Sequence, residues 1–166
     1  MPKIRFRAAL LAATLLTVPA LAEAQMPNGY GPAIGAEAAK KAIAAALAEA
    51  RKNSWRVAAA VVDPGGVLVA YEKMDDTQAG SAHVSQEKAR SAAAFKRPTK
   101  AFEDALAGGR QAILGLPGAV PLEGGIPIVA DGKIIGAIGV SGATSQQDGV
   151  CAQAGVAALE PKQAAK

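Results

Sequence analysis

The side chains best suited to chemistry lie in one stretch, between residues 81 and 100. His83 is the only histidine of the chain, and Glu87 and Arg90 follow it at helical spacing, so the three share one helix face. A neutral imidazole beside a surface groove is a suitable axial ligand for haem iron, and His83 is therefore our candidate metal ligand. It is also suited to act as a general base oriented by Glu87. The alternative is an exposed helix histidine beside an ordinary ion pair.

The same stretch is rich in positive side chains. Such groups pair well with bound carboxylates, for example the propionates of haem. A solvated helix face is the usual alternative, and composition does not choose between the two. The cationic cluster consists of Lys88, Arg90, Lys96, Arg97 and Lys100.

Several other chemistries are not expected from this composition. One histidine and one cysteine cannot form a structural zinc site within a single chain, and without a C-x-x-C-H motif any haem would be bound non-covalently. Ser141 lies in a sequence that only half resembles a G-x-S-x-G nucleophile elbow. Cys151 shares a helical stripe with Gly155 and Ala158, which predicts a buried small hydrophobe rather than a reactive thiol.

The first 24 residues have the pattern of a secretory signal peptide. Three positive residues precede an apolar segment over 8–21 that is too short to span a membrane comfortably, and two A-x-A cleavage sequences end it. We expect this leader, residues 1–24, to be removed, leaving a periplasmic or secreted protein with no stable membrane span. No basic block interleaved with aromatic residues remains after it, so nucleic acid is not an expected partner.

Hydrophobic patterning predicts that helices alternate with two β-hairpins. Residues 25–34 are rich in proline and glycine and are expected to form a flexible arm. Residues 110–125 hold apolar residues among glycines and prolines, where a short strand is one interpretation. The expected elements are helices over 35–53, 81–95, 100–107 and 144–160, and strands over 56–62, 67–71, 126–130 and 133–140.

The stretch over 124–160 organises the rest of the chain. Asp131-Gly132 separates two apolar runs and favours a two-residue turn in which both residues have positive φ. Thr144 and Gln147 form a capping-box sequence at the start of the last helix. The strands are too apolar to leave a sheet face in water, so helices must cover both faces. The prediction is an α+β fold with an antiparallel sheet between helices.

Five short motifs in order resemble the GlcG/HbpS family of haem-binding proteins, which includes the C-terminal domain of PduO-type corrinoid proteins. The resemblance covers about residues 35–159. The motifs are Val61-Val62-Asp63-Pro64-Gly65-Gly66, Lys88-Ala89-Arg90-Ser91-Ala92, Arg97-Pro98-Thr99, Gly124-Gly125-Ile126-Pro127-Ile128 and Gly136-Ala137-Ile138-Gly139-Val140-Ser141-Gly142.

This resemblance implies a domain over 35–160, followed by a short tail over 161–166. The implied architecture is a profilin-like three-layer α/β/α sandwich around a five-stranded antiparallel sheet, assembled into homo-oligomers. Arg97 and Thr99 match a family motif and would reach a ligand between subunits, or would instead cap the short helix and hold the helix junction. The candidate cofactor-binding residues are His83, Lys88, Arg97 and Thr99.

The leading functional hypothesis is an exported, oligomeric protein that binds haem, a related tetrapyrrole or another small anionic ligand. The first alternative is an enzyme or accessory protein for a small organic acid, with His83 or Glu87 as base and Arg97 holding a carboxylate. The second alternative is a scaffold that binds partner proteins and no ligand. A resemblance of this kind supports the fold more strongly than the function.

Overall fold

The structure is a computed structural model that describes residues 29–160. The predicted leader over 1–24, the first part of the predicted arm and the predicted tail over 161–166 lie outside the described residues.

The described residues form four α-helices, four strands and one 3₁₀ helix. The two helices predicted over 81–95 and 100–107 have those bounds, and both predicted hairpins are confirmed. The elements are α1 (Ala36–Lys52), β1 (Ala58–Val62), β2 (Leu68–Lys73), α2 (Ser81–Phe95), α3 (Lys100–Ala107), η1 (Gln111–Gly115), β3 (Gly125–Ala130), β4 (Lys133–Ser141) and α4 (Ser145–Ala157).

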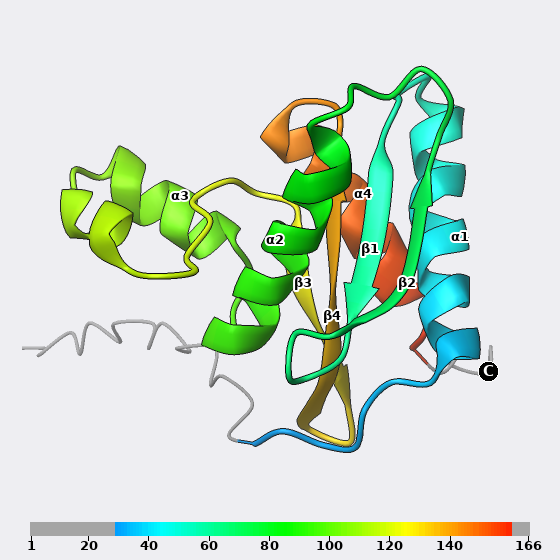
Figure 1. The fold of residues 1–166 in the computed structure, drawn as a ribbon, viewed down its shortest axis with the longest axis horizontal. Coiled ribbons are helices and arrows are strands. Elements are labelled where there is room, and N and C mark those ends of the chain that lie inside the picture. The colour runs from blue at the N-terminus through cyan, green and yellow to red at the C-terminus, as the bar shows by residue number, and fades with distance from the viewer. Residues whose placement is uncertain (1–28, 161–166) are drawn as a thin grey trace, which may run out of the picture.

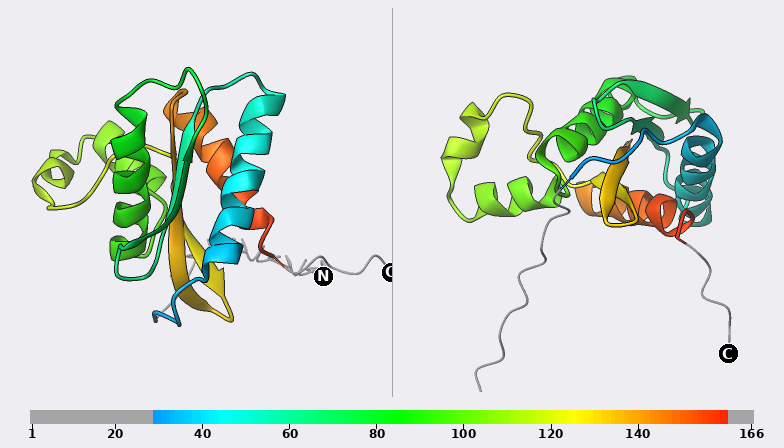
Figure 2. Two further views of the ribbon diagram at one scale, coloured as in Figure 1. Left: turned by 45° about the vertical axis from the view of Figure 1, so that its right-hand side comes forward. Right: turned by 90° about the horizontal axis from the view of Figure 1, so that it is seen from below.

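The strands form one antiparallel sheet in the order β2-β1-β4-β3. Helix α2 covers one face, whereas α1 and α4 lie side by side on the other, as Figure 1 and the left panel of Figure 2 show. The predicted α+β class with helices on both faces is therefore confirmed. The prediction of five strands is wrong for the described residues, where the sheet has four.

No fifth strand forms because the segment over 110–125 takes another path. Pro117 and Pro121 cannot donate backbone hydrogen bonds to a sheet, and Gly115 and Gly118 weaken extended pairing further. The segment contains the 3₁₀ helix η1 and then a loop that returns to β3. Together with α3 it forms an arm that projects away from the sandwich in Figure 1.

The C-terminal hairpin and helix follow their local sequence signals. Asp131 and Gly132 have φ values of 48° and 71°, as a two-residue turn with two positive φ angles requires. The Thr144 hydroxyl accepts a hydrogen bond from the Gln147 backbone N–H, and the Gln147 side chain accepts one from the Thr144 N–H, so the capping box is formed.

Backbone hydrogen bonds fix the N-terminal segment over 29–34 against β4. Its backbone lies along β4, where the Gly31 N–H donates to Ile134 O over 2.8 Å and the Ile34 N–H donates to Ile135 O over 2.8 Å. Ile34 is buried, and the Tyr30 hydroxyl donates to Ala93 O at the end of α2. The expectation of a loose arm is therefore wrong for these six residues.

Small side chains let the layers approach closely. The face of α2 toward the sheet carries alanine and serine, and α2 crosses β4 directly over Gly139. A Cβ atom at Gly139 would lie 2.0 Å from the backbone oxygen of Ser85. A Cβ atom at Gly136 would lie 2.5 Å from Val62 O, and one at Gly142 would lie 2.1 Å from Arg56 O, so these two glycines also permit close packing.

Candidate functional site

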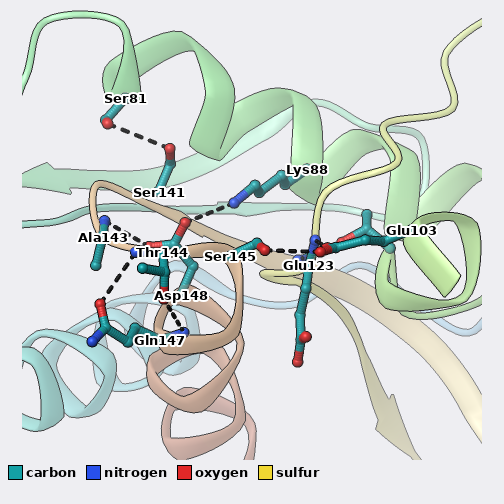
Figure 3. Close-up of polar contacts among 12 residues, drawn as sticks. Ser81, Lys88, Glu103, Glu123, Ser141, Ala143, Thr144, Ser145, Gln147 and Asp148 are labelled. Carbon is teal, nitrogen blue, oxygen red and sulfur yellow. Dashed lines mark hydrogen bonds and ion pairs between the residues drawn. The ribbon is translucent and has the colours of Figure 1, made fainter. Parts of the chain in front are cut away.

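A buried ion pair links the two helical layers. The Lys88 ammonium of α2 lies 2.8 Å from Oδ2 of Asp148 in α4, and the two side chains are only 2% and 3% exposed. The pair meets beside Gly124, just before the first residue of β3. Figure 3 shows the two side chains pointing toward each other from their helices. Burying two charges costs several kcal/mol per ion, so this contact is not explained by stability alone.

The sequence around each partner accounts for its position. Lys88 lies on the inward stripe of α2, between Ser85 and Ala92, both of which are buried. Asp148 lies in the first turn of α4, where the helix dipole stabilises a negative charge. Its Oδ1 also accepts a hydrogen bond from the Ala143 N–H over 3.1 Å.

Burial raises the pKa of the Asp148 carboxyl above its ordinary value of 3.8. The charge of Lys88 and its hydrogen bond act in the opposite direction and favour the ionised carboxylate, as does the Ala143 N–H. Desolvation is the largest of these effects. Asp148 is therefore a carboxylate whose ionisation depends on its lysine partner.

Serine and glutamate side chains extend the polar network around this pair (Figure 3). The Ser141 hydroxyl donates to Oγ of Ser81 over 3.3 Å, which joins the end of β4 to the start of α2. The Ser145 hydroxyl donates to Oε1 of Glu103 over 2.9 Å, and Oε2 of Glu103 accepts from the backbone N–H of Glu123. Glu103 thus attaches the projecting arm to the start of α4.

A mainly apolar cleft of about 340 Å³ lies beside the Lys88–Asp148 pair. It is formed by α4, the start of β3 and the residues around the start of α3. A Cβ atom at Gly149, which lines the cleft, would collide with the Glu123 side chain. Lys100 is the one cation among its lining residues, which are Pro98, Lys100, Glu123, Gly124, Gly125, Ile126, Gly149, Val150 and Gln153. We call this the apolar cleft.

The structure places His83 away from both the ion pair and the apolar cleft. His83 is exposed in the first turn of α2, about 140° around the helix axis from Lys88. Glu87 and Arg90 form the expected ion pair on its face of the helix, and Arg90 also donates to Gly66 O. His83 does not line the apolar cleft.

The predicted cationic cluster is dispersed. Lys88 turns inward to Asp148, and the other four cations each have a separate neighbour. Their contacts are Arg90 with Glu87, Lys96 over the Tyr30 ring, Arg97 over the Phe102 ring, and Lys100 with Asp104.

Thr99 is fully buried and holds the start of β3. Its hydroxyl accepts a hydrogen bond from the Gly125 N–H over 2.9 Å, and its own N–H donates to Gly125 O over 2.9 Å. It is the N-cap residue directly before α3, but its side chain makes no capping hydrogen bond, so the predicted cap is wrong. Thr99 and the exposed Arg97 thus flank Pro98 at the edge of the apolar cleft.

Cys151 is fully buried, as its small-residue stripe predicts. Burial is the main effect that raises the pKa of its thiol to about 12, with Asp148 and Glu49 adding to the rise. Because the thiolate is the reactive form, the native thiol is chemically inert at neutral pH.

Sequence reasoning missed Asp148 and Glu103 as members of the site. One signal did exist, because Lys88 occupies a buried position among alanines and serines and a buried ammonium requires a partner. That signal does not identify which of the acidic residues supplies the contact. The partner depends on how α2 and α4 meet past the end of β3, which is a tertiary property.

Among residues 29–160, no three histidine, cysteine or acidic side chains gather where they would hold a metal ion. Within the same residues, no helix combines the length and the hydropathy needed to cross a bilayer.

Comparison with known proteins shows the family. Residues 34–157 match the family model described as "Haem degrading protein HbpS-like". The chain belongs to the HbpS-like family. Protein GlcG of Escherichia coli K12 is 52% identical to it over 99 residues, which cover 60% of this chain and 74% of GlcG. The resemblance inferred from the five motifs is thereby confirmed.

Solved structures of the HbpS-like family have the same fold. A double mutant of Streptomyces reticuli HbpS superposes with a TM-score of 0.73 at 30% identity, covering 93% of this chain and 99% of that one. A PduOC:heme complex superposes with a TM-score of 0.70 at 28% identity, covering 76% of this chain and 94% of that one.

Proposed function

We propose that this HbpS-like protein binds haem non-covalently in the apolar cleft, as an exported homo-oligomer. The observation that carries the proposal is the cleft itself, whose apolar walls suit the faces of a porphyrin. The family supports the choice of ligand, since one structural neighbour of the same fold is a haem complex. The leader sequence supports export.

Two cations near the cleft are available to the edge of haem, while Glu123 is the one carboxylate among the described lining residues. Lys100 lines the cleft and is half exposed, while Arg97 is exposed just before Pro98. Cations at the rim pair with propionates that extend from an apolar pocket. Lys100 already contacts Asp104, so a propionate would compete with or share that contact.

A side chain that would hold the haem iron is not found among the described residues that line the cleft. Among the described lining residues of the cleft there is no histidine, cysteine, methionine or tyrosine. We therefore propose that His83 of a second copy approaches the iron, which makes the binding unit an oligomer. Exposed apolar side chains on the projecting arm, Leu114 and Leu116, support a subunit contact.

His83→Ala should shift the Soret band of the haemin complex and weaken haem binding by about tenfold or more, because it removes the imidazole. Absorbance titration of purified wild type and variant measures both effects. Gln146→Ala is the matched control, since it truncates another exposed side chain in the first turn of a helix. Identical spectra for wild type and His83→Ala would exclude the ligand assignment. If neither wild type nor His83→Ala shows saturable binding, haem is excluded as the ligand.

A further inference from the structure

Part of the apolar cleft is walled by bare backbone. Three of its lining residues, Gly124, Gly125 and Gly149, carry no side chain. A wall of this kind cannot adapt to a ligand by side-chain rotation, so its shape depends on where the backbones of β3 and α4 lie relative to each other. Whatever fixes that separation also fixes the width of the apolar cleft.

The Lys88–Asp148 ion pair lies directly behind this wall. A Cβ atom at Gly124 would lie 2.9 Å from Cβ of Asp148 and 3.0 Å from Nζ of Lys88. One at Gly125 would collide with the backbone oxygen of Lys88, and Gly149 follows Asp148 directly in α4. The two charged residues are therefore next to all three glycines, although neither of them lines the apolar cleft itself.

A buried ion pair fixes the distance between two elements more sharply than apolar contacts do. The ammonium and the carboxylate must stay near their 2.8 Å separation, because moving them apart would leave two buried charges unpaired. Apolar cores of unchanged volume, in contrast, lose a unique arrangement before they lose stability. Glu103 also joins the start of α4 to Glu123, but that link runs through half-buried side chains where water can replace it.

We propose that Lys88 and Asp148 are positioning residues for the apolar cleft, an inference that rests on the haem site proposed above. The pair holds α4 and the start of β3 at the separation at which the cleft admits a flat ligand. This gives the buried charges a role that their contribution to stability does not explain. A protein without the pair would fold with the same elements, but the width of its apolar cleft would vary.

The double variant Lys88→Met with Asp148→Leu tests this role, because it removes both charges at similar volume, which buried pairs commonly tolerate. In a haemin titration its haem Kd should rise about tenfold and its Soret band should shift, while its urea midpoint stays close to that of wild type. Ile34→Ala is the control, since it truncates a buried side chain that packs beside Gly136, near the start of β4. It should lower the urea midpoint and leave the haem Kd unchanged. Wild-type haem affinity in the folded double variant, or an equal loss of affinity in Ile34→Ala, would overturn the proposal.

A measurement without haem separates this proposal from the haem proposal. Amide hydrogen exchange in the ligand-free double variant should be faster than in wild type at Gly125 and over residues 148–153, and unchanged in α1. If the wild-type protein binds no haem, the haem proposal fails, and the exchange result alone decides whether the pair positions these walls. Unchanged exchange in both segments would refute the positioning role.

A second pair of substitutions keeps the test decisive should the first double variant not fold. Lys88→Gln with Asp148→Asn replaces the ions by neutral amides whose combined reach is one bond shorter, so the charges no longer hold the two walls at one separation. Its exchange at Gly125 and over residues 148–153 should again be faster than in wild type. Wild-type exchange together with wild-type haem affinity in this protein would refute the proposal.

Discussion

Lys88→Met should lower the free energy of unfolding by about 3–5 kcal/mol at neutral pH. The substitution keeps the volume of the side chain but leaves the Asp148 carboxylate buried without its cation. The remaining contact to the Ala143 N–H does not replace an ion pair of 2.8 Å. Urea denaturation followed by circular dichroism measures the loss.

The double variant Lys88→Met with Asp148→Leu is the matched control for this prediction. Removing both charges also removes the desolvation cost, so its stability should return to within about 1–2 kcal/mol of wild type. A single variant as stable as wild type would show that Lys88 and Asp148 are not paired in the interior.

The loss of unfolding free energy caused by Lys88→Met should also depend on pH. Burial already raises the pKa of Asp148, and removal of Lys88 takes away the main effect that opposes this rise. A carboxyl whose folded-state pKa is raised contributes stability below its unfolded pKa, and this contribution is lost as the pH increases through the folded pKa. The loss of unfolding free energy in Lys88→Met should therefore be smallest near pH 3.8, the ordinary pKa of this carboxyl. It should be fully developed at pH values above the raised pKa of Asp148. Lys88→Met with Asp148→Asn should lack this dependence.

Gly139→Ala should destabilise the protein by about 3 kcal/mol, although it adds a single methyl group. The new Cβ would lie 2.0 Å from Ser85 O and 2.5 Å from Ala89 N, and both atoms belong to the backbone of α2. A helix backbone cannot rotate away as a side chain can, so α2 would have to move off β4. The urea denaturation midpoint measures this effect.

Gly80→Ala is the control for the glycine prediction. Gly80 precedes α2 with helical dihedral angles, and no atom lies within 4 Å of the position its Cβ would take. Its unfolding free energy should change by no more than about 0.5 kcal/mol. Equal effects of the two substitutions would contradict the close packing of α2 on β4.

Local sequence signals predicted most of the fold because they act within a few residues. The Asp131-Gly132 turn set the C-terminal hairpin, and the Thr144–Gln147 capping box set the start of α4. Alternation of helices and hairpins then allowed few architectures other than a covered antiparallel sheet. The incorrect prediction of a fifth strand came from the family resemblance and not from such local signals, and the prolines over 110–125 oppose a strand there.

The candidate site was less predictable because its contacts join distant elements. The sequence groups Lys88 with a cationic cluster that either pairs with a bound anion or is solvated, whereas Lys88 turns inward to a residue 60 positions away. Thr99 was expected at a helix cap and instead holds Gly125. His83 is a candidate by its chemistry alone, and no local pattern predicts that it lies away from the apolar cleft formed by α4 and β3.

A haemin titration of Val150→Glu against Val67→Glu tests the haem proposal most directly. Both valines are exposed, at 48% and 65%, but only Val150 lines the apolar cleft, while Val67 lies in the β1–β2 hairpin. A glutamate at 150 would be desolvated by a bound porphyrin and would repel its propionates, so the haem Kd should rise about tenfold or more. Val67→Glu should bind haem as wild type does. Equal haem affinity of the two variants would contradict binding in the apolar cleft.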